Sequence, residues 1–169
     1  ERIEEEQVEK LTMHGLKQED YLVIDNRLKK IAHRLAKCCN PIYGDEIFGF
    51  VTVSEGISIH RVNCPNAAQL ISKYGYRVVK ARWAETGQQI YLPASIRITG
   101  IDDMGILSRI SEVISNDLKV NMRSVSVESN EGMFEGIITL FVKDTGHLDV
   151  LIRQISKIKG ILHVSRLEI

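Results

Sequence analysis

The chain has 169 residues, of which 44% are hydrophobic, so it can bury a core in one ordinary domain or in two small ones. Its 22 basic and 22 acidic residues balance, which excludes a uniformly basic nucleic-acid coat and an acidic solvating tail. No apolar run approaches the roughly 18 residues of a membrane span, and no signal-peptide pattern opens the chain, so we expect a cytoplasmic protein without membrane contact. Because the first residue is Glu1 rather than Met, we also expect a piece of a longer protein.

Charge is distributed unevenly along the chain. Residues 1–26 carry eight acidic and three basic side chains, residues 27–82 carry ten basic and three acidic ones, and residues 83–169 carry nine basic and eleven acidic ones. A polar stretch at 85–89 coincides with the second change of sign and marks a linker. We therefore predict a helical linker over 1–26, a first module over 27–86 and a second module over 87–169.

The first module mixes short strands and helices. The end of the linker predicts a strand (21–24) and the cap Asp25 of a helix with apolar residues at 28, 31, 32 and 35. The rest of the module predicts a hairpin (47–53 and 57–60), a helix (65–74) and a strand (76–83). A module of this size is near the limit at which a core alone is marginal. We therefore expect a metal or an interface to add stability.

The second module has a more regular pattern. It predicts a strand (90–101), a helix (104–118), two strands joined by a turn (120–128 and 133–142), a helix (146–159) and a final strand (161–169). The order β-α-β-β-α-β is that of the ferredoxin-like fold, a four-stranded antiparallel sheet with both helices on one face. The fold class is therefore α+β, with a small α/β module followed by a ferredoxin-like domain.

Cys38, Cys39, His60 and Cys64 are the candidate metal ligands of the first module, with the spacing C-C-x20-H-x3-C. An odd number of cysteines argues for reduced thiols rather than a disulfide framework. The spacing of His60 and Cys64 is typical of half a zinc site, whereas adjacent cysteines do not easily turn toward one ion. Spacing alone leaves a metal site and a set of small buried core residues equally open.

A thiol enzyme is a further interpretation of the same residues. Cys38 or Cys39 would be the nucleophile and His60 its base. No third orienting group is evident in the sequence, and a four-coordinate zinc would use every ligand and leave no open position for chemistry.

The segments AKCCNPIYGDEIFGF (36–50) and GISIHRVNCP (56–65) resemble the C-terminal regulatory region of the long RelA/SpoT enzymes. These are the bacterial (p)ppGpp synthetases and hydrolases of the stringent response. The match is dense over 33–83 and continues to residue 169. The resemblance implies that the first module is the zinc-finger-like, or inter-subunit, domain of that family and that Cys38, Cys39, His60 and Cys64 are zinc ligands.

The resemblance also implies a contact with large-subunit ribosomal RNA. The net charge of +7 over residues 27–82 agrees with this, because lysines and arginines neutralise phosphates without reading sequence. The candidate RNA-binding residues are Arg34, Lys37, Arg61 and Arg82. For each of them alone, an ordinary solvated surface position remains the simpler interpretation.

The segments ITGIDDMGIL (98–107) and LKVNM (118–122) resemble the ACT domain, a regulatory fold that often binds amino acids and pairs with a second copy. The amides at a helix N-terminus can receive a carboxylate. The candidate amino-acid-binding residues are Asp102, Gly105, Ile106 and Asn121. Met104 replaces a proline that is common in ACT domains, and Asp102 and Asp103 alternatively cap the helix, with Asn121 serving a turn.

We therefore expect a noncatalytic regulatory fragment of a bifunctional or synthetase-only (p)ppGpp synthetase/hydrolase of the GTP pyrophosphokinase family. The implied partners are the ribosome, tRNA, the enzyme's own N-terminal catalytic half, a branched-chain amino acid and a second copy. The alternative is a free-standing amino-acid-sensing ACT protein with a zinc-stabilised adaptor.

Overall fold

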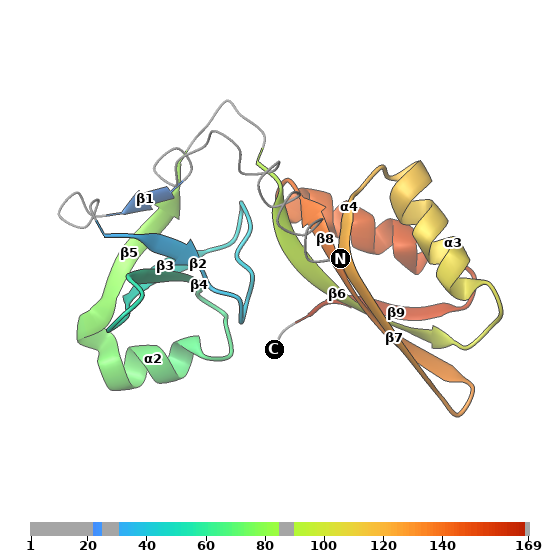
Figure 1. The fold of residues 1–169 in the computed structure, drawn as a ribbon, viewed down its shortest axis with the longest axis horizontal. Coiled ribbons are helices and arrows are strands. Elements are labelled where there is room, and N and C mark those ends of the chain that lie inside the picture. Colours follow the sequence, from blue (N-terminus) through green and yellow to red (C-terminus); the bar gives the residue numbers. More distant parts are fainter. Residues whose placement is uncertain (1–21, 25–30, 85–89, 168–169) are drawn as a thin grey trace. The chain divides into compact units, whose positions relative to one another are not determined.

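The computed structural model describes residues 22–24, 31–84 and 90–167. The chain divides into two compact units, and the boundary between them falls after Ile90 (Figure 1). Among the described residues, no helix is both long enough and apolar enough to cross a membrane.

The first unit contains a five-stranded sheet with the order β1-β5-β3-β4-β2. Its strands are β1 (Leu22–Ile24), β2 (His33–Leu35), β3 (Ile47–Val51), β4 (Ile57–Arg61) and β5 (Val78–Trp83), and helix α2 (Ala67–Tyr74) with the short η3 (Gly75–Arg77) lies between β4 and β5 in sequence. The pairs are antiparallel except β2 with β4, which are parallel. The predicted first strand, the hairpin and the helix before β5 are confirmed.

The predicted helix from Asp25 to residue 35 is wrong at its C-terminal end. His33–Leu35 is the strand β2, and residues 25–30 lie outside the described residues. Backbone hydrogen bonds from Ile57 N to Ala32 O and from Ala36 N to Ile59 O, both 2.8 Å, align this segment with β4. Pairing with a neighbouring strand therefore outweighed the helical spacing of a few apolar residues. The helical linker predicted over 1–26 falls almost wholly outside the described residues.

Gly56, in the turn between β3 and β4, lies against the backbone just before β2. Its φ is +81°, and a Cβ on it would lie 2.1 Å from the carbonyl oxygen of Ala32. The close approach of two backbones therefore requires glycine here.

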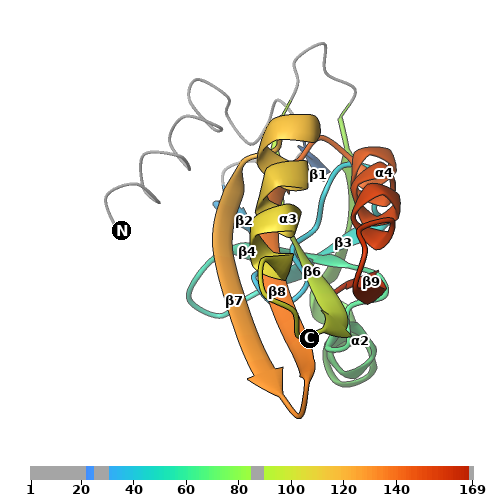
Figure 2. The same ribbon diagram turned by 90° about the vertical axis from the view of Figure 1, so that its right-hand side faces the viewer.

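The second unit is a four-stranded antiparallel sheet with the order β7-β8-β6-β9. Its elements are β6 (Leu92–Ile101), α3 (Ile106–Glu112), the π-helical turn η4 (Val113–Asp117), β7 (Met122–Asn130), β8 (Met133–Val142), α4 (Thr145–Ser156) and β9 (Ile161–Arg166). This is the predicted ferredoxin-like order, and β8 has the predicted bounds. Figure 2 shows α3 and α4 beside the sheet.

Only one face of this sheet is buried. Along β6, every second residue from Leu92 to Ile98 is buried, and the residues between them are half-buried or exposed. Buried isoleucines and leucines of α3, η4 and α4 cover this face. The buried side chains, which alternate along the strand and recur every 3.6 residues along the helices, thus form one apolar layer.

Candidate metal centre

Three separate segments of the first unit carry the four soft ligands. Cys38 and Cys39 lie in the turn after β2, His60 is on β4, and Cys64 lies in the turn before α2. The turn after β2 closes with a hydrogen bond from Asn40 N to Ala36 O of 3.0 Å, and Asn40 has a φ of +43°. This helix-like turn points both neighbouring thiols toward His60. Adjacent cysteines can therefore face one ion here.

The four ligand atoms converge on one point. The thiols of Cys38, Cys39 and Cys64 and a ring nitrogen of His60 all lie within 4.8 Å of one another. Cys38 Sγ is 3.5 Å from Cys64 Sγ and 3.4 Å from His60 Nδ1, and Cys39 Sγ is 3.9 Å from His60 Nδ1. All three cysteines are free thiols.

The 3.4, 3.5 and 3.9 Å separations are close to those of a tetrahedral zinc site, although the cluster as a whole is wider than one, at up to 4.8 Å. Zn–S bonds of about 2.3 Å and Zn–N bonds of about 2.0 Å place two sulfurs about 3.8 Å apart and a sulfur and a nitrogen about 3.5 Å apart. Three thiolates and one imidazole are also a donor set that structural zinc sites use. The residues present therefore fit a structural metal ion, held through Nδ1 of His60.

Burial favours the neutral forms of three of the four candidate ligands. It raises the pKa of the Cys39 thiol to about 12, and burial together with the neighbouring Cys64 thiol raises the pKa of Cys38. Burial also lowers the pKa of His60. A divalent cation would reverse this preference, because it binds the thiolate forms and the neutral imidazole.

The same pKa directions weigh against the thiol-enzyme interpretation. A nucleophilic cysteine needs a thiolate at neutral pH, which requires a lowered pKa. Burial instead raises the pKa values of Cys38 and Cys39. It lowers the pKa of His60, which disfavours the imidazolium cation that would stabilise a thiolate.

The four RNA-binding candidates are in different environments. Arg34 and Lys37 lie together beside the metal centre, where Arg34 forms an exposed ion pair with Glu55. Arg82 is exposed on β5, three strands away from β2 in the sheet order. Arg61 corrects the expectation of a surface cation, because its side chain is only 2% exposed, and its Nε and Nη2 have no partner among the described residues.

The amino-acid-binding candidates do not form one site within the chain. Asp102, Gly105 and Ile106 lie at the end of β6, where the Asp102 amide bonds to the Gly132 carbonyl. The carbonyl of Asn121 instead accepts from the amide of Phe141, at the far end of β8. The two groups are separated by about eight strand residues, or roughly 26 Å.

Helix α3 begins without a side-chain cap, which corrects the capping role expected for the two aspartates. Its N-cap is Gly105, with a φ of +86°. Asp103 Oδ2 instead accepts a hydrogen bond of 3.0 Å from Nη2 of Arg109. Ile106, whose amide bonds to the carbonyl of Asp103, is only 5% exposed.

Comparison with known proteins matches each unit to a family. The RelA/SpoT RIS domain family matches residues 23–84, and the ACT domain family matches residues 89–166. The chain thus carries a RIS domain followed by an ACT domain. The curated relatives are GTP pyrophosphokinases and (p)ppGpp synthases or hydrolases. Both domains and these relatives are those of the RelA/SpoT family, consistent with the C-terminal regulatory region of its enzymes.

The similarity to individual relatives is moderate and extends over both units. The bifunctional (p)ppGpp synthase/hydrolase RelA of Mycobacterium tuberculosis is 34% identical over 79% of this chain, and the GTP pyrophosphokinase of Escherichia coli is 33% identical over 82% of it. The chain spans 18% of the length of each. A crystal structure of the ACT domain from the GTP pyrophosphokinase of Chlorobium tepidum is 34% identical, with a TM-score of 0.42, over 46% of this chain and 99% of the solved chain.

Proposed function

We propose that this chain is a noncatalytic regulatory region that controls a (p)ppGpp synthetase/hydrolase, and that its first unit is a zinc-stabilised RNA-contacting domain. The observation that carries the proposal is the convergence of four soft ligands from three segments, in the part of the chain that matches the RIS domain. Contacts with the ribosome and tRNA, with the catalytic half, or with a second copy would favour one arrangement of the whole enzyme. The proposed domains are 27–86 and 87–169, and the pairing of β1 with β5 adds Leu22–Ile24 to the first of them.

Cys38, Cys39, His60 and Cys64 would hold the zinc. The ion would supply four bonds that tie the turn after β2 to the end of β4 and to the start of α2. With all four positions taken by protein, its role would be structural. We therefore expect metal content and folding of the first unit to change together.

Metal analysis of the full chain purified under reducing conditions tests the site. We expect one equivalent of zinc, lost in His60→Ala and kept in the matched variant His163→Ala, whose histidine is exposed in the second unit. A zinc-free protein with one fast-alkylating thiol would contradict the proposal and favour the thiol enzyme.

The RNA contact would rest on the exposed cations Arg34, Lys37 and Arg82. Binding to purified large ribosomal subunits should weaken steeply as salt rises. Arg82→Glu should lower the slope of log affinity against log salt by about 1 if Arg82 meets a phosphate. Arg153→Glu, an exposed charge reversal on α4, should leave that slope unchanged. Insensitivity of the binding to salt would remove the RNA role.

The second candidate function, favoured by the ACT match, is amino-acid sensing by the second unit. Asn121 lies far from Asp102, Gly105 and Ile106, so a site that uses all four residues would need two copies of the chain. Calorimetry against leucine, isoleucine and valine, with the oligomeric state measured on the same sample, tests this. Absence of heat with all three would count against the sensor.

A further inference from the structure

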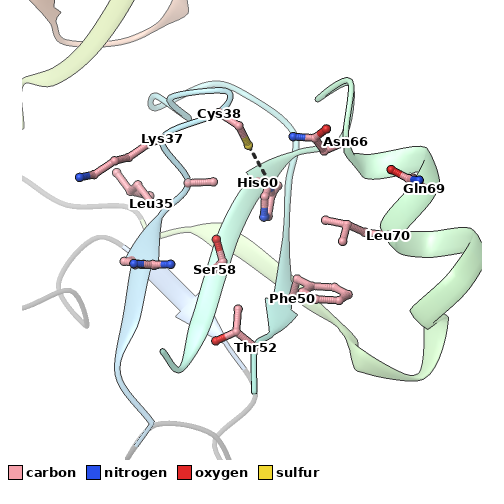
Figure 3. Close-up of a pocket in the computed structure, with 12 residues that line it drawn as sticks. Leu35, Lys37, Cys38, Phe50, Thr52, Ser58, His60, Asn66, Gln69 and Leu70 are labelled. Carbon is pink, nitrogen blue, oxygen red and sulfur yellow. Dashed lines mark hydrogen bonds between the residues drawn. The ribbon is translucent and has the colours of Figure 1, made fainter. Parts of the chain in front are cut away.

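A pocket of about 500 Å³ lies against the metal centre on one face of the first-unit sheet. Figure 3 shows its walls, which come from β2, β3, β4, the turn with Lys37 and Cys38, and α2. This volume lies within the range of sites that hold a small organic molecule. The proposed zinc and RNA contacts do not use this space.

One row of side chains across the sheet forms the floor of the pocket. Arg34 on β2 and Phe50 on β3 are both register partners of Ser58 on β4. His60 lies two residues beyond Ser58 on the same strand, so its ring shares that face. The pocket and the metal centre therefore have His60 in common.

The floor offers hydrogen-bonding groups to a ligand. His60 directs Nδ1 toward Cys38 Sγ, and within the described ranges no residue pairs with its other ring nitrogen. A metal on Nδ1 leaves the proton on Nε2, which can then only donate. Metal-bound imidazoles ordinarily donate this proton to an oxygen, and a bound ligand with an acceptor oxygen would provide one. The hydroxyl of Ser58, 6% exposed and likewise without a partner among the described residues, lies on the same face.

The remaining walls combine apolar, amide and cationic groups. Leu70 and Gln69 line the pocket from α2, with the ring of Phe50 beside Leu70 (Figure 3). Asn66 adds a second amide beside Cys38. Lys37 is exposed, and in the described part of the chain it has no ion-pair partner.

These groups match three features of a nucleotide. A base is flat and has a largely apolar face, its edge carries donors and acceptors that asparagine and glutamine side chains recognise, and its phosphate is anionic. We propose that the pocket binds a single nucleotide, with the base against Phe50 and Leu70, its edge toward Gln69 and its phosphate at Lys37. This inference deepens the proposed RNA contact and rests on the proposed zinc site for the orientation of His60. The nucleotide would be either free or an unstacked residue of a single-stranded RNA.

Titration of the zinc-loaded full chain with nucleoside 5′-monophosphates, and separately with single-stranded hexaribonucleotides, tests the inference by amide NMR. We expect saturable shifts centred on Ser58, Gln69 and Leu70. Gln69→Ala should weaken binding about threefold to tenfold, the usual effect of one lost hydrogen bond. Hexanucleotides that bind tighter than every monophosphate would identify RNA as the source, and equal affinities would identify a free nucleotide; either result supports the pocket.

A matched pair of charge reversals separates a site from a charged surface. Lys37→Glu reverses the charge at the rim of the pocket, whereas Lys73→Glu reverses an exposed charge at the end of α2 that does not line it. We expect only Lys37→Glu to weaken binding. Equal weakening by both variants, or no saturable shift at the pocket with either probe, would overturn the inference. Zinc content is measured on the same samples. Absence of nucleotide binding by zinc-loaded protein means that the pocket has failed, whereas absence of zinc means that the metal site has failed.

Discussion

The two units of this chain stabilise their folds in different ways. In the second unit the buried side chains are apolar, with Ile96, Ile98, Ile114, Leu140 and Ile155 fully buried. Among the described residues, every buried polar or charged one lies in the first unit. There the core cluster under α2 includes Cys39 and Cys64.

The helices show the same difference. The N-cap of α4 is Asp144, whose carboxylate accepts a hydrogen bond of 2.7 Å from the His147 amide. The N-cap of α2 is Asn66, which makes no side-chain capping bond, but the Ala67 amide bonds to the carbonyl of Cys64 at 2.9 Å. A metal on Cys64 would thus fix the start of α2. The start of one helix is thus tied to a candidate metal ligand, whereas the start of the other is fixed by a side-chain cap.

The largest effect is expected from removal of the metal, which should unfold the first unit alone. A strong chelator under reducing conditions is expected to unfold the first unit and to leave the second folded, because structural zinc contributes about 10–16 kcal/mol of apparent binding free energy in zinc-finger peptides. Amide NMR would show loss of dispersion for residues 33–83 only. Spectra unchanged in both units, or collapsed in both, would contradict the distinction.

Truncation of the apolar core should damage the second unit alone. Ile98 is fully buried on β6, so Ile98→Ala is expected to lower the free energy of unfolding of this unit by about 2–5 kcal/mol. Leu162→Ala, at a residue 61% exposed on β9, should change it by less than about 0.5 kcal/mol. Denaturant titration measures both, and zinc content should stay at the wild-type value. A loss of zinc in Ile98→Ala would show that the units are not independent.

Loss of the side-chain cap of α4 should lower the stability of the second unit moderately. Asp144→Ala removes the hydrogen bond to the His147 amide and is expected to cost the second unit about 1 kcal/mol. Asp149→Ala, an exposed aspartate further along the same helix, is the matched control. Equal thermal stabilities of the two variants would contradict a capping role for Asp144.

The smallest effect expected is a pH dependence from His147. Burial, with the charge of Lys143, lowers the pKa of His147 in the folded state, and its Nδ1 accepts from the Lys143 amide at 3.0 Å. As pH falls through the ordinary histidine pKa of about 6.5, the unfolded chain takes up a proton before the folded one does. The free energy of unfolding of the second unit should therefore fall below that pH.

Substitution of the histidine checks this assignment. His147→Gln should flatten the slope of unfolding free energy against pH between pH 7.5 and 5.5, measured by denaturant titration at each pH. An unchanged slope in the variant would assign the pH dependence to other groups.

The regular elements were the predictable part of this fold. The alternation of apolar residues over 133–142 gave β8 its bounds, and the β-α-β-β-α-β order followed from periodicity. The short segment around residue 33 was mispredicted, because its structure depends on pairing with β4, which local sequence does not encode.

The candidate sites were predictable only in part. Cysteine and histidine types mark the four ligands in the sequence, and the structure brings them close enough to bind a metal. The burial of Arg61 and the separation of Asn121 from Gly105 depend on tertiary packing and strand register, which composition does not reveal. Ser58 and Gln69 had no motif around them. Only the two-residue interval between Ser58 and His60, on a predicted strand, placed one of them beside a ligand.

The position of the four ligands in the sequence has a consequence for biosynthesis. All of them precede Pro65, so the complete ligand set is made before any residue of the second unit, which begins at Tyr91. Domains generally fold as units, with the N-terminal one first during translation. If the proposed site binds zinc, the nascent first domain could do so, and close the 26-residue interval from Cys38 to Cys64, before the second unit is complete. Folding of this domain during translation would then depend on the zinc supply of the growing cell.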